Sequence, residues 1–339
     1  MVIDLNTVWF LLVGGLLAGY AVLDGFDLGV GILHLFVRDD EGRRTFINAI
    51  GPVWDGNEVW LVTSGGALFA AFPAVYAGVF SGFYPAMILL LFALIFRAVA
   101  IEFRSKQPMR WWRAAWDASF AAASCLASFL MGVAFGNVIR GIPLDTHGEY
   151  VGGFVTLLNP YALLTGLTTV ALFAMHGAIY LVLKTDGAIQ AKVRSWVNDT
   201  IIVFVMCYAT TTMATLLYLP HMGDQFKAHP WTFALPLATM LAIANVPREI
   251  FHGREWRAFL SSCAAVFGLM GLVGLGMYPN LVRGSDPATS LSIYNAASSA
   301  GTLTTMLIIA AIGFPLVLGY TVSIYWIFRG KVRLDSMSY

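Results

Sequence analysis

Charged side chains are scarce in this chain of 339 residues. Asp, Glu, Lys and Arg together make up 12% of the residues, whereas 58% are hydrophobic, and the mean hydropathy is +0.74. Soluble domains carry about 25% charged residues, so the composition excludes an ordinary soluble domain and indicates a membrane protein. A formal net charge of +1 also excludes the broad basic surface that binds nucleic acid.

Cysteine is equally rare, and the common reaction motifs are missing. The three cysteines, Cys125, Cys207 and Cys263, form no Cys-x-x-Cys pair and have no zinc-site spacing. We expect them to be small core residues. The chain also has no phosphate-binding glycine loop and no recognisable pairing of a nucleophile with a base. Its motifs therefore point to no soluble enzyme class.

What the chain does have is a succession of long apolar runs. A span of about 20 apolar residues is needed to cross a bilayer as a helix. The runs predict an all-α membrane protein with nine transmembrane helices in a single domain over residues 1–339. They lie near residues 8–36, 53–72, 76–103, 114–138, 154–183, 196–219, 231–246, 258–278 and 302–328.

The basic residues predict the orientation of these helices. If the first connection is cytoplasmic, the inner segments hold almost all of the 20 basic residues. The outer segments hold Arg140, Lys227 and Arg283, and Arg97 is the one basic residue inside a span. Cytoplasmic loops are normally enriched in Lys and Arg. We therefore expect the N-terminus outside and the C-terminus in the cytoplasm.

Two neighbouring spans carry carboxylic acids. Asp24 and Asp27 lie in the first span, and Asp55 and Glu58 lie in the first turns of the second. Residues at i and i+3 share one face of a helix. A charged side chain at the bilayer centre costs about 2.5 to 3.5 kcal/mol on insertion scales, so such residues usually face a partner, a cavity or a pathway. The four acids therefore predict a site that takes up protons.

Simpler interpretations exist for several charged residues. Asp55 follows Pro52, which suits a first helical position, so it can complement the positive end of the helix dipole. Arg97 can neutralise one of the four acids as a buried ion pair with a structural task. Glu102 and Asp117 lie at the cytoplasmic edge, where we expect them to be solvated.

Histidines and glycines point to structure more than to a site. His34 lies near the cytoplasmic end of the first span and His176 within the fifth, at different depths, so no bis-histidine haem site is predicted. We expect His176 to be a hydrogen-bonded packing residue. The patterns Gly15-x-x-x-Gly19 and Gly25-x-x-x-Gly29 predict close packing of the first helix against its neighbours.

Several motifs in the first half of the chain resemble one known family, subunit II of the cytochrome bd quinol oxidases and the related cyanide-insensitive oxidases. The resemblance is strongest over residues 20–140 and weaker beyond about residue 185. It extends to Phe96-Arg97 and Leu158-Asn159-Pro160. The main motifs are Asp24-Gly-Phe-Asp-Leu-Gly-Val-Gly31, Gly51-Pro-Val-Trp-Asp-Gly-Asn-Glu-Val-Trp60, Gly65-Gly-Ala-Leu-Phe-Ala-Ala-Phe-Pro73 and Gly132-Val-Ala-Phe-Gly-Asn137.

The resemblance implies a complex of the bacterial cytoplasmic membrane that oxidises quinol and reduces oxygen to water, with protons taken from the cytoplasm. Haem b and haem d would be ligated by the partner, subunit I, and this chain would ligate no haem or metal. The expected fold is two four-helix bundles plus one peripheral helix, packed against subunit I through a broad apolar interface. Membrane lipid, a structural quinone and small single-helix accessory subunits are further partners that the resemblance raises.

The resemblance also assigns roles to individual residues. Asp55 matches the acid of the Trp-Asp-Gly motif, and Asp24 and Asp27 match those of the Asp-Gly-Phe-Asp motif. These acids are expected to deliver protons toward the haem centre, with Trp54 and Asn57 lining or fixing the path. Glu58 stands where some relatives carry an uncharged amide. Trp60 matches a residue near the mouth of an oxygen tunnel in some members.

We therefore interpret the chain as a haem-free oxidase subunit with a cytoplasmic proton path. Two alternatives use the same residues differently: a proton-coupled secondary transporter, and a purely structural membrane subunit. Transporters often show inverted repeats and broken helices at the midplane, and the sequence shows neither.

Overall fold

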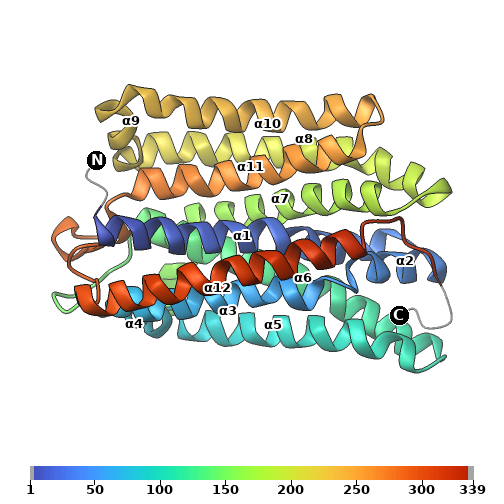
Figure 1. Cartoon of the computed structure of the whole chain (residues 1–339), viewed down its shortest axis with the longest axis horizontal. Helices are drawn as coiled ribbons and strands as arrows, with labels where there is room; N and C mark the ends of the chain where they lie inside the picture. The colour runs from blue at the N-terminus through green and yellow to red at the C-terminus, as the bar shows by residue number, and fades with distance from the viewer. Residues whose placement is uncertain (1–3, 335–339) are drawn as a thin grey trace.

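The computed structural model describes residues 4–334, and most of this range is helical (Figure 1). The first three and last five residues of the predicted domain lie outside the described range. A short antiparallel sheet pairs β1 (Asn280–Val282) with β2 (Leu291–Ser292). The α-helices are α1 (Leu5–Leu33), α2 (Asp40–Ile50), α3 (Trp54–Ala71), α4 (Pro73–Gly82), α5 (Tyr84–Phe103), α6 (Arg110–Arg140), α7 (Pro160–Lys184), α8 (Gly187–Tyr218), α9 (Asp224–Ala228), α10 (Ala234–Phe251), α11 (Glu255–Met277) and α12 (Ala300–Ile327).

Every predicted apolar run contains a helix. Within the described residues, seven helices are long and apolar enough to cross a membrane: α1, α5, α6, α7, α8, α11 and α12. The other two predicted runs contain α3 and α10, which are 18 residues each and run alongside the longer helices in Figure 1. The structure therefore gives an all-helical membrane protein with seven spans that meet these criteria.

The largest difference from an expected boundary is at α8, which begins at Gly187 and not near residue 196. Three other differences involve prolines. The run 76–103 is broken at Phe83 into α4 and α5, and Pro85 stands in the first turn of α5, where its missing N–H cannot extend α4. Similarly, α7 begins at Pro160, capped by the side chain of Asn159, and not at residue 154. The third difference is Pro52, which lies in the turn before α3 and not at its first position.

The helix α2 was not predicted because it is short and polar. Its 11 residues begin after Asp39, whose carboxylate caps the backbone N–H of Gly42. Its inner face buries Phe46, Ile47 and Ile50 in the main hydrophobic core. An amphipathic helix of this length has no apolar run, so a scan for membrane spans passes over it.

The helix α1 is central and packs against α3, α6, α7 and α11. Its closest approach is to α7: a Cβ added to Gly29 would lie 1.9 Å from the carbonyl oxygen of Phe173, and one on Gly177 would lie 2.4 Å from the carbonyl carbon of Gly29. The predicted close packing is confirmed for Gly19, Gly25 and Gly29. At Gly15, by contrast, an added Cβ would meet nothing within 4 Å.

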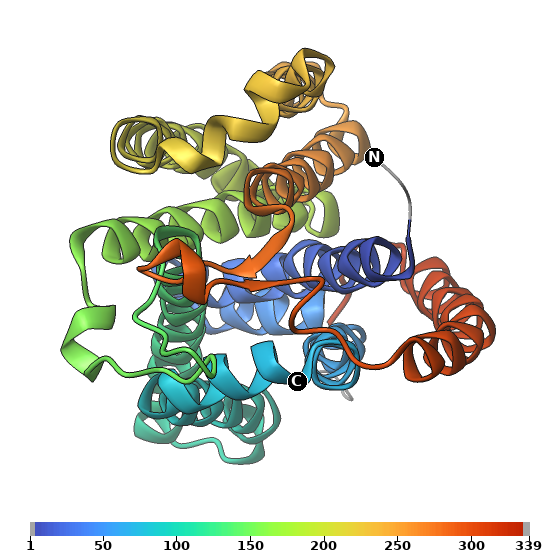
Figure 2. The same ribbon diagram turned by 90° about the vertical axis from the view of Figure 1, so that its left-hand side faces the viewer.

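The end-on view in Figure 2 shows α12 at one edge of the molecule. None of the most apolar window of α12 is buried within the chain. The two ends of the bundle also differ, since α2 lies at one end and α4, α9 and the sheet lie at the other (Figures 1 and 2).

The expectation that all three cysteines lie in the core is wrong for Cys125, which is exposed, while Cys207 and Cys263 are half-buried.

Candidate functional site

The acids of the first span lie in the C-terminal third of α1 and are completely buried. Asp24 and Asp27 each have 0% exposure. The helix that carries them starts at a capped end, where the Asp4 carboxylate accepts a hydrogen bond from the Thr7 backbone N–H. A carboxyl group buried at membrane depth needs hydrogen-bond or ionic partners. Different partners serve the two acids.

Asp24 is bound by Arg97 of α5. The Arg97 Nη2 lies 2.6 Å from Asp24 Oδ1, and Nη1 lies 3.1 Å from Asp24 Oδ2, so the guanidinium makes the two-point contact typical of strong Arg–carboxylate pairs. The same Nη1 lies 3.3 Å from Oε1 of Glu58 on α3. The ion pair that the sequence left open is thus present, and it joins α1, α3 and α5.

Asp27 is bound by an amide and not by a cation. The Asn57 side-chain amide on α3 donates to Asp27 Oδ2 over 2.7 Å and to the Leu23 carbonyl over 3.1 Å. The Asn57 carbonyl oxygen accepts a hydrogen bond of 2.9 Å from the Tyr325 hydroxyl on α12. The second oxygen of Asp27 is buried and has no hydrogen-bond partner within the described part of the chain.

The remaining predicted residues lie along α3. Asp55 is in its first turn, with an exposed side chain, one turn from Glu58, whose side chain is 21% exposed. Trp54 is buried in the main core. Trp60 is buried as well, between Gly19 of α1 and the ring of Phe314 on α12. The structure therefore brings Asp24, Asp27, Asn57, Glu58 and Arg97 together, and leaves Asp55 at the surface of the isolated chain.

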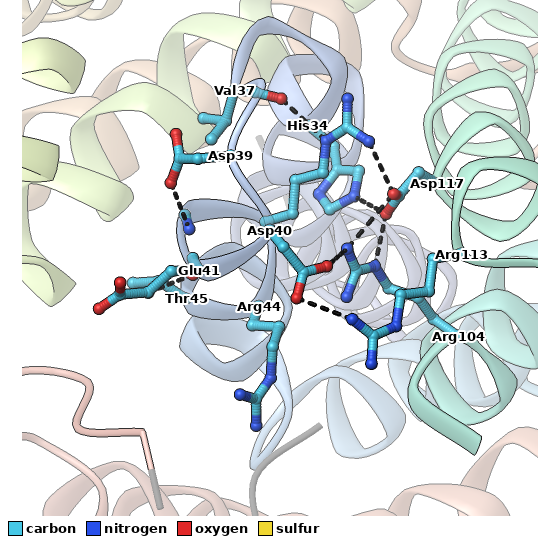
Figure 3. A network of polar contacts seen from close by, with 12 residues as sticks. His34, Val37, Asp39, Asp40, Glu41, Arg44, Thr45, Arg104, Arg113 and Asp117 are labelled. Atoms are coloured by element: carbon cyan, nitrogen blue, oxygen red, sulfur yellow. Dashed lines mark hydrogen bonds and ion pairs between the residues drawn. The ribbon is translucent and has the colours of Figure 1, made fainter. Parts of the chain in front are cut away.

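A second ionic network lies nearer the α2 end of the bundle, and sequence analysis missed it (Figure 3). His34 Nε2 lies 2.6 Å from Asp117 Oδ1, and Arg104 Nε lies 2.6 Å from the same oxygen. Arg43 Nη1 on α2 lies 2.8 Å from Asp117 Oδ2. Asp117 is only 1% exposed, so the expectation that it is solvated is wrong. Three donors from three segments hold it inside the protein.

The network continues outward through Asp40 at the start of α2. Asp40 accepts from Arg104 over 2.8 Å and from Arg113 over 3.1 Å, as Figure 3 shows. Glu102, the other acid expected at this edge, is half-buried. One feature of the sequence could have indicated this network. His34 lies seven residues beyond Asp27, which is about two helical turns, so the two side chains share one side of the first helix about 10 Å apart along its axis.

The two buried histidines make different contacts, and Nδ1 of His34 has no hydrogen-bond partner within residues 4–334. His176 uses both ring nitrogens, Nδ1 with the Ser262 hydroxyl at 2.8 Å and Nε2 with the Val22 carbonyl at 2.9 Å, and its ring is stacked on Phe259. This confirms the packing role expected for His176. His34 binds Asp117 through Nε2, and its ring packs edge-on against Phe120. Between residues 4 and 334 there is no group of three His, Cys, Asp or Glu side chains that could hold a metal ion.

The site around α1 has more carboxyl groups than cations. Asp24, Asp27 and Glu58 surround one guanidinium, that of Arg97. With all three acids ionised, the group would therefore carry more negative than positive charge. Unpaired carboxylates are costly in a low-dielectric interior, so the excess favours proton binding by the group as a whole. The arrangement can therefore hold protons, and exchange them where it reaches the surface.

Comparison with known proteins places this chain in a family. The family described as "Cytochrome bd terminal oxidase subunit II" matches residues 5–328. "Cytochrome bd-I ubiquinol oxidase subunit 2" of Escherichia coli (strain K12) is 36% identical over 366 aligned positions, which cover 98% of this chain and 96% of that protein. "Cytochrome bd ubiquinol oxidase subunit 2" of Bacillus subtilis (strain 168) is 33% identical, with 99% of both chains covered.

A solved structure shares the fold. The bd oxidase from Geobacillus thermodenitrificans contains a chain that superposes with a TM-score of 0.79 at 15% identity, covering 96% of this chain and 98% of that one. The helical membrane architecture, the full-length family match and the relatives agree with one another. This chain belongs to the cytochrome bd terminal oxidase subunit II family, and it is a multi-pass inner-membrane subunit of a bacterial respiratory oxidoreductase.

Proposed function

We propose that this chain contributes a cytoplasmic proton path to a bd-type oxidase that oxidises quinol and reduces oxygen to water. Asp24, Asp27 and Glu58 form the buried part of the path, and Asp55 forms its exposed part. The observation that carries the proposal is the excess of buried carboxyl groups over the single cation, Arg97.

The position of the site supports cytoplasmic uptake. We assign the end of the bundle that holds α2 to the cytoplasm, because Arg43, Arg104, Arg113 and Lys331 lie there and cytoplasmic segments are enriched in basic residues. With α3 and α10 added to the seven long helices, nine spans put the N-terminus outside and the C-terminus inside. Glu58 and Asp55 then lie near the cytoplasmic start of α3.

The binding of Asp27 supports a transferable proton there. Asn57 supplies a neutral donor to one oxygen, and no cation binds the other within residues 4–334. A carboxyl group held in this way can carry a proton on its second oxygen and release it without breaking an ion pair. Asp24 differs, because Arg97 binds both of its oxygens.

The relatives support a proposal for the partner and the cofactors. The E. coli and B. subtilis relatives are named as subunit 2 of ubiquinol oxidases, and we propose that a haem-bearing subunit I, with haem b and haem d, covers the exposed apolar side chains of α3 and α5. The chain would then form two four-helix bundles, with α12 as the peripheral helix. The family resemblance also leads us to propose a structural quinone, small single-helix subunits and an oxygen tunnel near Trp60.

The test is Asp55→Asn in the assembled complex. We expect the variant to assemble with its full haem content and to consume oxygen more slowly with quinol, because an amide cannot pass a proton. Asp199→Asn, which removes an exposed acid on α8, is the matched control and should keep wild-type turnover. Unchanged turnover of an assembled Asp55→Asn complex would remove the relay role. Loss of assembly would instead support a purely structural subunit.

The transporter alternative receives no support from the relatives reported above, which are oxidase subunits. A reduced-minus-oxidised optical spectrum of the complex purified through this chain separates the two directly. Haem bands with quinol-dependent oxygen uptake favour the oxidase, and a colourless complex without uptake favours the transporter.

A further inference from the structure

The peripheral helix α12 reaches the buried acids through one side chain. Most of α12 faces away from the other helices, yet Tyr325, near its C-terminal end, is half-buried and points its hydroxyl at Asn57. The Tyr325 ring lies edge-on to Phe26 of α1, with 6.5 Å between the ring centroids. Tyr325 therefore makes two contacts: its ring packs against Phe26, and its hydroxyl bonds to Asn57 and so joins α12 to α3.

The hydroxyl decides which way the Asn57 amide faces. A side-chain amide has one accepting and one donating end. With the Tyr325 hydroxyl donating to the carbonyl oxygen, the amide nitrogen faces two acceptors, Asp27 Oδ2 and the Leu23 carbonyl. The flipped amide would turn its own oxygen toward both of these oxygens and leave them without a donor. Leaving buried acceptors unpaired is costly, so the phenol selects the orientation in which Asp27 receives a hydrogen bond.

We propose that Tyr325 is a positioning residue for proton transfer, acting on Asp27 through Asn57. This inference rests on the proposed proton path and extends it to the peripheral helix. Tyr325 itself passes no proton in this scheme: it keeps the Asn57 donor on one oxygen of Asp27, which leaves the other oxygen as the position for the exchangeable proton.

The experiment compares two single-hydroxyl deletions in the intact oxidase complex. Tyr325→Phe keeps the ring against Phe26 and removes the donor to Asn57. Tyr180→Phe is the matched control, because its ring stacks on the same Phe26 at 3.9 Å but its hydroxyl donates to the Ala49 carbonyl. The probes are the carboxyl C=O band of Asp27 in infrared difference spectra, identified by its loss in Asp27→Asn, and the pH profile of quinol-dependent oxygen uptake.

We expect Tyr325→Phe to move the Asp27 band and the pH profile, with turnover at neutral pH falling roughly fivefold, about the effect of one neutral hydrogen bond. Tyr180→Phe should move neither. Asn57→Leu removes the same link from the other side, so it should move the Asp27 band in a comparable way, and adding Tyr325→Phe to it should have no further effect. This second variant keeps the test decisive if Tyr325→Phe assembles poorly.

An unmoved Asp27 band in both Tyr325→Phe and Asn57→Leu would overturn the proposal. An equal shift in Tyr180→Phe would also overturn it, since the effect would then come from repacking around Phe26. One combination of results separates the two proposals. If Asp27→Asn keeps wild-type turnover while Tyr325→Phe moves the Asp27 band, the proposed proton path is wrong, but the effect of Tyr325 on Asp27 through Asn57 is supported.

Discussion

Arg97 and Asp24 form a two-point ion pair that is completely buried between α5 and α1. Removing one member of a buried pair leaves the other charge uncompensated, at a cost of about 3 to 5 kcal/mol. In this chain the loss of Arg97 is especially severe, because Glu58 also lies within 3.3 Å of the same guanidinium.

The first prediction follows from this geometry. Arg97→Gln should sharply reduce the amount of assembled complex recovered from membranes, because Asp24 and Glu58 then lose the cation that they share in an apolar interior. The double variant Asp24→Asn with Arg97→Gln should recover more complex than Arg97→Gln alone, because it removes both charges. Recovery is measured by purification through a tag and by haem content. Equal recovery of the single and double variants would contradict the ion pair's role.

A second prediction concerns the network around Asp117. Asp117→Asn leaves Arg43 and Arg104 without their shared carboxylate, and both lie close to His34. We expect a loss of stability of about 3 kcal/mol or more, seen as a lower thermal midpoint of the detergent-solubilised complex. Asp199→Asn removes an exposed acid and should leave the midpoint unchanged. A similar midpoint in both variants would show that the network adds no stability.

A third prediction uses two glycines of one helix. Gly29→Ala should separate α1 from α7, because its new Cβ would lie 1.9 Å from the Phe173 carbonyl oxygen. Gly15→Ala is the matched control, since its Cβ meets nothing within 4 Å and alanine favours a helix by up to about 1 kcal/mol over glycine. Thermal midpoints should therefore fall for Gly29→Ala and hold or rise for Gly15→Ala. A reversed order would disprove the close approach.

A fourth prediction concerns pH and His221, which lies in the loop between α8 and α9. Burial lowers the pKa of His221 below its usual value of 6.5, while its contact of 3.1 Å with the Ile139 carbonyl opposes this shift. The unfolded chain therefore takes up a proton at this position at a higher pH than the folded chain does. As the pH falls below about 6.5, the unfolded state gains more protons and the folded state loses relative stability.

His221→Gln should reduce that loss, since glutamine keeps a donor for the Ile139 carbonyl and does not titrate. The measurement is the thermal midpoint of the complex at a series of pH values from neutral to mildly acidic. We expect the midpoint of His221→Gln to fall less steeply than that of the wild type. An identical slope would show that His221 makes no contribution to the acid sensitivity.

The sequence predicted the helices well where apolar runs were long and unbroken, as in α1 and α6, because bilayer thickness sets their length. It failed at the break around Phe83 and missed α2. A hydropathy scan averages over many residues, so it does not detect the helix break that Pro85 causes. It also cannot recognise a short helix such as α2, whose apolar residues occupy a single face.

The sequence by itself determined that acids lie on one face of the first span and at the start of the second, since helical periodicity fixes which residues share a face. Only the tertiary structure decided their partners. Asp24 faces Arg97, Asp27 faces Asn57, and Asp117 is enclosed by His34, Arg43 and Arg104. Partner choice depends on how helices distant in sequence rotate and cross. In this chain, the contact at Gly29 and Gly177 sets how closely α1 approaches α7.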